Sequence, residues 1–160
     1  MTKKIYGYNE LLLLTIKQSS KKLVLVGGCF DIFHYGHLRF LYEARRVGDA
    51  LVVALESDDF IRIRKQREPI HTQEQRAEIL ASLDIVDFIV LLPFFSGYSD
   101  YLAFIQQIKP SIIAVTDQDP NREEKQRQAE SVGAKLEVVC PLILTPSTTS
   151  IIRYASIFSN

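Results

Sequence analysis

Short apolar runs recur along the chain, separated by longer stretches in which polar and apolar residues mix. Each run is rich in Val, Ile and Leu and is continuous rather than alternating. Continuous runs of this kind are typical of strands that are covered on both faces of a parallel sheet. Five strands are predicted in this way: Leu23–Val26, Ala50–Leu55, Phe88–Leu92, Ile112–Val115 and Leu136–Cys140.

The stretches between the runs place apolar residues three and four positions apart, as the buried face of an amphipathic helix requires. Such a helix is predicted over Leu38–Val47, with Gly48 at its exit. Thr72 and Gln75 form a predicted capping box at the start of another helix. Further helices are predicted over Tyr101–Ile108, Asn121–Val132 and Thr148–Phe158, and Asn9 is expected to cap a short helix over Leu11–Gln18.

Strand and helix alternate through the sequence. This order predicts an α/β fold, in which a five-stranded, Rossmann-like parallel sheet carries helices on both faces. No repeat, low-complexity tract or linker interrupts the pattern, so residues 1–160 are expected to form a single domain. Ligands bind beyond the carboxyl ends of the strands in such sheets, so the segments after Val26, Val115 and Cys140 are expected to share one rim.

Composition narrows the class of protein. The chain has 47% hydrophobic and 24% charged residues, which is ordinary for a globular domain. A formal net charge of zero argues against a nucleic-acid surface. The apolar runs are too short to cross a bilayer, and the start of the chain does not resemble a signal peptide. Cys29 and Cys140 show no metal-ligand spacing, so a reduced, cytoplasmic protein is expected.

The most informative segment joins the first predicted strand to the next helix, and it reads Gly27-Gly28-Cys29-Phe30-Asp31-Ile32-Phe33-His34-Tyr35-Gly36-His37. A helix start leaves backbone N–H groups without helical partners and presents the positive end of the peptide dipoles. His34 and His37 flank Gly36, which lacks a side chain that would block a ligand. Imidazole N–H groups can donate to phosphate oxygens, so the segment predicts a polyphosphate site.

Two other kinds of site are less well supported by this segment. A metal pair at the histidines lacks a third Cys, His or carboxylate ligand at a recognisable offset. A dinucleotide-dependent dehydrogenase is disfavoured, because no Gly-x-Gly-x-x-Gly follows the first strand.

The segment resembles the His-x-Gly-His signature of the nucleotidylyltransferase superfamily. The chain is most similar to the adenylyltransferase domain of ADP-heptose synthases, and next to the glycerol-3-phosphate cytidylyltransferases. Further blocks that resemble the family are Leu11–Leu14, Lys21–Asp31, Arg39–Asp49, Arg67–Ile70, Glu74–Arg76 and Ser147–Ile152.

The resemblance implies a reaction. A nucleoside monophosphate would pass from ATP to a sugar or polyol phosphate, releasing pyrophosphate, with Mg²⁺ carried by the triphosphate. The two partners are then a nucleoside triphosphate and a small phosphorylated acceptor. A CTP-dependent enzyme like the glycerol-3-phosphate cytidylyltransferases is the alternative.

The resemblance also implies roles for individual residues. His34 and His37 would be catalytic, stabilising charge that builds at the α-phosphate. The nucleotide would be bound by Gly28, Cys29, Phe30, Gly36, Asp117, Ser147, Thr148 and Thr149. The acceptor would be bound by Asp31, Arg64, Lys65 and Arg76. No residue is assigned to a metal ion.

Some of these residues have structural alternatives. Ser147–Thr149 can cap the last helix through a hydroxyl group, and we expect this together with phosphate binding. Arg64, Lys65 and Arg67 belong to a basic stretch that is either a solvated loop or a mobile clamp on phosphate.

Two further residues each have two possible roles. Arg76 either binds the acceptor or pairs with Glu74 or Glu78. Asp31 either faces the acceptor or is buried against backbone N–H groups.

One departure from the family keeps a second class of function open. The heptose-type domains carry Lys-Gly-Gly-Asp after the fourth strand, where this chain has Val115–Asp119. A non-catalytic nucleotide-binding module is therefore the rival hypothesis. Phe94, Phe95 and Tyr98 either form a homodimer surface or pack internally.

Overall fold

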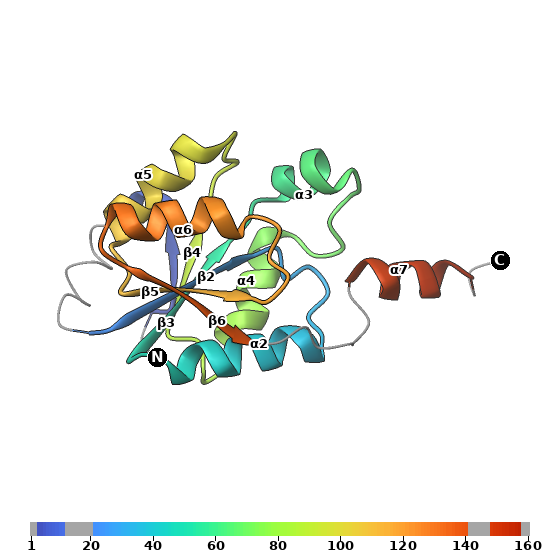
Figure 1. The fold of residues 1–160 in the computed structure, drawn as a ribbon. Helices are drawn as coiled ribbons and strands as arrows, with labels where there is room; N and C mark the ends of the chain where they lie inside the picture. Colours follow the sequence, from blue (N-terminus) through green and yellow to red (C-terminus); the bar gives the residue numbers. More distant parts are fainter. Residues whose placement is uncertain (1–2, 12–20, 141–147, 158–160) are drawn as a thin grey trace.

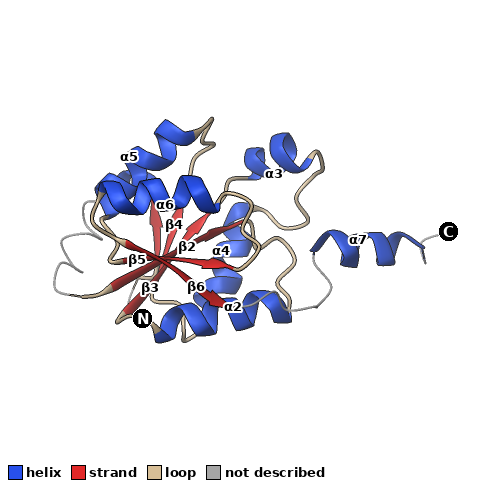
Figure 2. Ribbon diagram, viewed as in Figure 1, coloured by secondary structure: helices blue, strands red, loops and turns tan. Residues whose placement is uncertain are grey.

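The centre of the molecule is a parallel sheet with helices on both faces (Figures 1 and 2). The computed structural model describes residues 3–11, 21–140 and 148–157. The strands are β1 (Ile5–Gly7), β2 (Leu23–Gly28), β3 (Ala50–Leu55), β4 (Phe88–Leu91), β5 (Ile112–Thr116) and β6 (Lys135–Cys140). The helices are the 3-10 helix η1 (Tyr8–Glu10) and the α-helices α2 (Tyr35–Arg46), α3 (Asp58–Lys65), α4 (Gln73–Ala81), α5 (Tyr98–Ile108), α6 (Arg122–Ser131) and α7 (Thr148–Ile157).

The sheet has six strands in the order β1-β4-β3-β2-β5-β6, so the expectation of five strands is wrong. The additional strand, β1, lies parallel to β4 at one edge, with Ile5 opposite Ile89. Its three residues are too few to show a periodicity in the sequence. The buried ring of Tyr6 holds this short strand against the core.

The basic stretch after β3 is also different from its prediction, because it forms helix α3 instead of a loop. The Ser57 hydroxyl accepts a hydrogen bond from the backbone N–H of Phe60 at 3.1 Å and caps the helix. Acidic residues occupy the first turn and basic residues the last, which favours the helix dipole. Only Ile61 of this helix is buried, so the hydrophobic signal in the sequence is weak.

Other predicted boundaries shift slightly. Helix α2 begins at Tyr35 rather than at Leu38, and the capping box of Thr72 and Gln75 is confirmed at the start of α4. Asn9 lies inside η1 and is not its cap residue. Most of the helix that was predicted to follow it lies outside the described residues.

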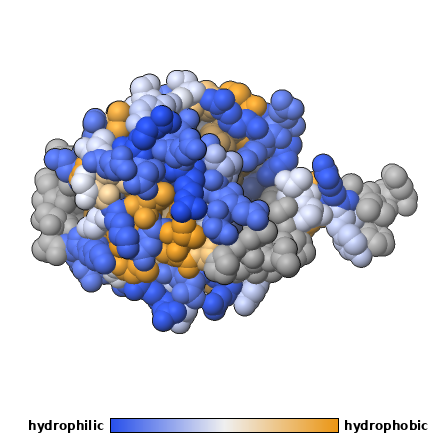
Figure 3. Space-filling view, in the orientation of Figure 1, coloured by the Kyte–Doolittle hydropathy of each residue, from blue (hydrophilic) through white to orange (hydrophobic). Residues whose placement is uncertain are grey.

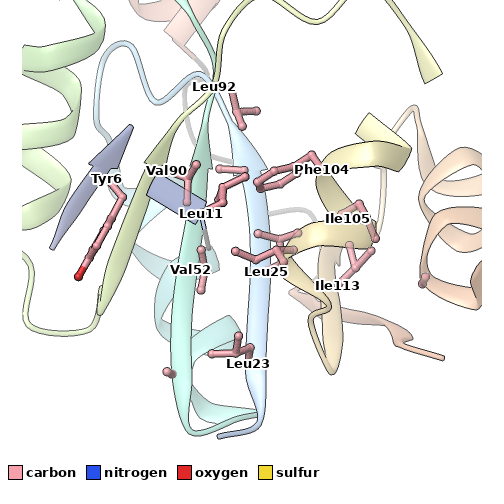
Figure 4. Close-up of a cluster of buried hydrophobic side chains, with 14 of the residues drawn as sticks. Tyr6, Leu11, Leu23, Leu25, Val52, Val90, Leu92, Phe104, Ile105 and Ile113 are labelled. Atoms are coloured by element: carbon pink, nitrogen blue, oxygen red, sulfur yellow. The ribbon is translucent and has the colours of Figure 1, made fainter. Parts of the chain in front are cut away.

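Alternate residues of the central strands pack on opposite faces of the sheet. Leu23 and Leu25 of β2 belong to a cluster with Phe104 and Ile105 of α5. Figure 4 shows Leu25 near the α5 side chains and Leu23 farther along the strand. The intervening Val24 and Val26 belong to a second cluster on the other face, with α2 and α4. Both faces are therefore buried, as the continuous apolar runs predict.

The surface is mixed. On the face in Figure 3, α6 is hydrophilic, and hydrophobic area lies below it over β6, the edge strand opposite β1.

Of the aromatic residues Phe94, Phe95 and Tyr98, Phe95 is buried in the first cluster and therefore packs internally. Helix α7 stands apart from the sheet in Figure 1. Within the described residues, no helix has the length and apolar character needed to span a membrane.

Candidate functional site

The order of the strands reverses beside β2. From β2 the chain adds β3 and β4 on one side, and then returns to add β5 and β6 on the other. The crevice between the carboxyl ends of β2 and β5 is where parallel α/β sheets bind ligands. Gly27 and Gly28 end β2, and the exposed Asp117 follows β5. The structure therefore brings the predicted glycine segment and Asp117 to the same rim.

Helix α2 begins within the predicted polyphosphate segment. His34 is its N-cap residue and makes no capping hydrogen bond through its side chain, while His37 lies in the first turn. The Leu38 N–H donates to the His34 carbonyl at 3.1 Å, so the N–H groups of residues 35–37 precede the first helical hydrogen bond. Imidazoles and free backbone N–H groups thus occur together at the positive end of this helix.

The two imidazole rings are stacked, with centroids 3.7 Å apart and planes inclined by 22°. The ring of His37 also lies against the rings of Phe30 and Phe33, at centroid distances of 5.0 Å and 5.8 Å. The Nδ1 atoms of both histidines are buried and make no hydrogen bond with the described residues. Packing therefore positions the rings. The two Nδ1 atoms keep unused hydrogen-bonding capacity, while the Ile32 backbone forms a hydrogen bond with the His37 ring.

Burial keeps both rings neutral at pH 7. It lowers the pKa of His37 to about 4, with a further contribution from the neighbouring His34 and a weaker opposing one from the Ile32 backbone. Burial also lowers the pKa of His34. A neutral imidazole still has one N–H to donate, and a bound polyphosphate would favour its protonated form.

The loop that carries the histidines is shaped by two residues. Phe30 is buried with φ of 48°, in the left-handed region that non-glycine residues rarely adopt. A Cβ atom at Gly28 would lie 2.9 Å from the Phe30 ring, so only glycine fits there. The strained Phe30 backbone is the kind of feature that accumulates at functional sites.

Asp31 is buried and faces the protein rather than the rim. Its carboxylate accepts hydrogen bonds from the backbone N–H of Ile70 at 2.9 Å and of His71 at 3.0 Å, and pairs with the Arg67 guanidinium. Burial alone would raise the pKa of Asp31, but these hydrogen bonds and the Arg67 charge hold it below its usual value. Of the two alternatives for Asp31, the structure shows the buried one.

Arg76 is fully buried, and its guanidinium joins four parts of the rim. It donates to the carbonyls of Cys29 at 2.6 Å, Glu56 at 2.9 Å and His71 at 3.1 Å, and pairs with Asp58 at 2.7 Å. Of the two alternatives for Arg76, the pairing with Glu74 or Glu78 does not form, because the side chain turns inward to the sheet. A contact with the acceptor stays a prediction. Arg76 thus positions the ends of β2 and β3.

A cavity of about 570 Å³ opens on the α5 side of the same rim. Its lining begins at Gly27, Gly28 and Cys29 of the glycine segment. Aromatic side chains from α3, the segment after β4 and α5 form much of its wall: Phe60, Phe95, Tyr98, Tyr101 and Phe104. The histidines do not line this cavity, because they lie on the α2 side with Phe30 and Phe33. The end of β2 therefore lies between the cavity and the two histidines.

Glu56 is a cavity residue that the sequence reasoning missed. It is only 7% exposed, and its Oε1 accepts a hydrogen bond from the Tyr101 hydroxyl at 2.8 Å. Burial raises the pKa of Glu56 to about 7, against the lowering effects of Tyr101, Lys125, Arg76 and Lys65. Its position directly after the β3 run was a usable signal, since carboxyl ends of strands carry the ligand sites.

Arg64 and Lys65 also line the cavity, from the last turn of α3. The Arg64 guanidinium donates to the Ser96 carbonyl at 2.6 Å. Lys125 of α6, which the sequence reasoning did not select, lines the opposite wall and pairs with Asp119 at 2.6 Å. The cavity thus combines aromatic walls with cations contributed by two helices.

The hydroxyl segment before the last helix is not brought to this rim by the described residues. Ser147 lies outside them, and α7 begins at Thr148. Thr149 is exposed on α7, which stands apart from the sheet in Figure 1. A phosphate-binding role for these residues stays a prediction.

The acidic, histidine and cysteine side chains of the described residues are not grouped as metal ligands. Within residues 3–11, 21–140 and 148–157, no three His, Cys, Asp or Glu side chains gather as a metal site. The carboxylate nearest to the histidines in sequence, Asp31, is engaged by Arg67 and backbone N–H groups. The binding of Mg²⁺ together with a triphosphate stays a prediction.

Comparison with known proteins identifies the family. The model of the cytidylyltransferase-like family matches residues 25–153, which include the whole rim. The chain belongs to this family. Its relatives are nucleotidyltransferase enzymes, in agreement with the resemblance seen in the sequence.

Two kinds of curated relative are similar to this member of the cytidylyltransferase-like family. Bifunctional protein HldE of Campylobacter jejuni is 41% identical over 112 residues, which cover 69% of this chain and 23% of that protein. The chain therefore spans about a quarter of the length of such relatives. FAD synthase of Pyrococcus horikoshii is 39% identical over 125 residues, which cover 76% of this chain and 81% of that protein.

Solved structures agree with the fold. The lipopolysaccharide core biosynthesis protein from Thermoplasma volcanium has a TM-score of 0.62 and 27% identity, covering 78% of this chain and 98% of that one. Pantoate-beta-alanine ligase from Francisella tularensis has a TM-score of 0.69 and 16% identity, covering 99% of this chain and 79% of that one. At that identity, the second likeness shows the fold alone.

Proposed function

We propose that this chain transfers an adenylyl group from ATP to a small phosphorylated acceptor and releases pyrophosphate. One observation carries the proposal. His34 and His37 stack at the start of α2, and a cavity opens on the other side of the β2 end. A triphosphate at the helix start and an acceptor in the cavity would meet over the backbone of Gly27 and Gly28.

The proposed chemistry needs no covalent intermediate. An oxygen of the acceptor phosphate attacks the α-phosphorus and forms a new P–O bond. The bond from that phosphorus to the bridging oxygen of the β-phosphate breaks, and pyrophosphate leaves with the electron pair. His34 and His37 donate N–H groups to the phosphate oxygens as negative charge shifts onto them. Mg²⁺, when bound to the triphosphate, supplies further charge neutralisation.

The choice of ATP over CTP rests on the relatives rather than on a base-binding contact. The sequence resembles adenylyltransferase domains, and FAD synthase is among its relatives. A flavin adenine dinucleotide contains an adenylyl group joined to a flavin phosphate, so a flavin phosphate is a second candidate acceptor beside a sugar phosphate. The aromatic walls of the cavity favour this second acceptor.

Pyrophosphate release tests the proposal. ATP and CTP are each combined with glycerol 3-phosphate, a set of sugar 1-phosphates and flavin mononucleotide, with magnesium present. We expect ATP to give pyrophosphate with one acceptor class, and to raise the melting temperature more than CTP does. Nucleotide binding without pyrophosphate from any acceptor would contradict the enzyme and support a non-catalytic module.

A further inference from the structure

The cavity contains one buried polar atom without a partner. Glu56 is only 7% exposed and lines the cavity, and its Oε2 makes no hydrogen bond with any described residue. Its other oxygen, Oε1, accepts from the Tyr101 hydroxyl at 2.8 Å. Buried polar atoms in folded proteins nearly always have partners, so the exception at Oε2 requires an explanation.

The backbone around Glu56 holds this carboxyl group in place. The Glu56 N–H donates to the Gly28 carbonyl at 3.1 Å, and its own carbonyl accepts from Arg76 at 2.9 Å. The Tyr101 hydroxyl restrains the side chain from the α5 side. The carboxyl group is therefore preorganised, which lowers the cost of using it to bind a ligand.

Of the four neighbouring cations, Lys65 makes no ion pair with Glu56 among the described residues, and the other three are engaged by other groups. The Arg76 guanidinium is bonded to Asp58 and to three carbonyls, Lys125 pairs with Asp119, and Arg64 donates to the Ser96 carbonyl. No ion pair joins any of these to Glu56 among the described residues. The partner that fits Oε2 is an N–H or O–H group of a molecule inside the cavity.

The rest of the lining indicates the character of that molecule. Phe60, Phe95, Tyr98 and Phe104 give the cavity broad aromatic surfaces, and a volume of about 570 Å³ suits a small ring system. Polar side chains of α3 and α6 also line the cavity, so a bound molecule needs polar groups at its edge as well as flat faces. A flat ring with one or two N–H groups would stack on the walls and satisfy Oε2.

We infer that this cavity selects an acceptor whose phosphate is attached to a flat, mainly apolar ring system, and that Glu56 recognises an N–H or O–H group of that ring. The inference rests on the proposed function in treating the ligand as the acceptor of that reaction. The fit of the ligand to the cavity and to Glu56 can be tested by binding alone. Arg64 and Lys65 lie on the same lining and provide positive charge for the acceptor phosphate.

The test is a titration of the protein with flavin mononucleotide at pH 8.5, where Glu56, with a pKa of about 7, is ionised and Oε2 can accept. Binding is followed by flavin fluorescence, without any triphosphate. In Glu56→Gln, the amide oxygen can still accept from Tyr101, but the NH₂ group that replaces Oε2 cannot accept from the ligand. We expect flavin mononucleotide to bind the wild type, and the variant to bind it at least about tenfold more weakly, or about 1.4 kcal/mol. Glu78→Gln, on the exposed surface of α4, is the matched control and should bind like the wild type.

A second variant keeps the inference testable if Glu56→Gln does not fold. Tyr101→Phe removes only the hydroxyl group that orients Glu56, and should weaken flavin binding by a smaller factor than Glu56→Gln. Equal flavin affinity in the wild type and Glu56→Gln would overturn the inference, and so would binding of a sugar 1-phosphate in place of the flavin. The titration contains no triphosphate, so it does not depend on turnover. A failure of pyrophosphate release would therefore count against the proposed function without changing the outcome of the flavin-binding test.

Discussion

His34 and His37 show how one short segment can combine rigidity with unused hydrogen-bonding capacity. Their rings are stacked on each other, and His37 packs on two phenylalanines, so both side chains are positioned before any ligand arrives. Preorganised donors of this kind act where charge develops in a transition state. The identity of these residues was available from the sequence, whereas their stacking and low pKa depend on burial.

Replacement of either histidine by alanine should lower turnover by about 10²–10³, the loss that follows removal of one such donor. The partly exposed His34→Ala should leave the melting temperature nearly unchanged, and the more buried His37→Ala should lower it by a few degrees. Pyrophosphate release and thermal unfolding measure the two effects. Tyr42→Phe, on an exposed part of the same helix, is the control. Full activity with a large loss of stability would show that the histidines are structural.

Glu56 makes the stability of the protein depend on pH in a defined window. Its pKa of about 7 in the folded state exceeds the ordinary value of 4.5, so the folded protein holds this proton more tightly than the unfolded chain. The resulting stability is present below about pH 4.5 and is lost as the pH rises to about 7. Glu56→Gln does not titrate and should not lose it.

The difference in melting temperature, Glu56→Gln minus wild type, should therefore increase between pH 5 and 7 and level off above pH 8. His37 loses stability in the opposite direction, as the pH falls from about 6.5 to about 4, but equally in both proteins. Its contribution cancels in the difference. A difference that stays constant from pH 5 to 8 would mean that Glu56 is not protonated in the folded protein near neutral pH.

At the scale of the element, the rim is held together by a buried side chain of α4. Helix α4 has only a short apolar face, yet Arg76 extends from it to the ends of β2 and β3 and to the start of α3. The capping box of α4 could be predicted from the sequence, because that signal is local. It did not reveal the partners of Arg76, since Asp58 and Cys29 are distant in sequence and only the fold brings them close.

Arg76→Lys should therefore destabilise the protein by about 3 kcal/mol, because one ammonium group cannot replace a planar guanidinium that bonds in four directions. Chemical denaturation measures this free energy of unfolding. Arg46→Lys is the matched control, since Arg46 is 66% exposed and its pair with Glu43 lies on the surface. Equal stability of the two variants would mean that the contacts of Arg76 are not needed to hold the rim.

Helix α3 is an element whose form the sequence analysis did not predict. It was expected to be a loop because a single buried residue, Ile61, gives no hydrophobic periodicity. The signals that were present were the Ser57 cap, the acidic first turn and the basic last turn. Its helical form places Arg64 and Lys65 on the wall of the cavity.

At the scale of the whole molecule, the site follows from the order of the strands. The order in which the chain adds strands reverses beside β2, so the loops after β2 and β5 lie on either side of one crevice. The helices α2 and α5 cover opposite faces, and the end of β2 therefore has the two histidines on one side and the aromatic cavity on the other.

The sequence by itself determined the features that depend on neighbouring residues: the continuous apolar strands, the capping box of Thr72 and Gln75, and the glycine–histidine segment at a helix start. These follow from local periodicity and from the chemistry of adjacent side chains. The tertiary structure decided the position of β1 in the sheet, the inward direction of Asp31 and Arg76, and the grouping of Glu56 with aromatic residues of three separate segments. Burial and contact between distant residues are properties of the packed sheet, and no local pattern records them.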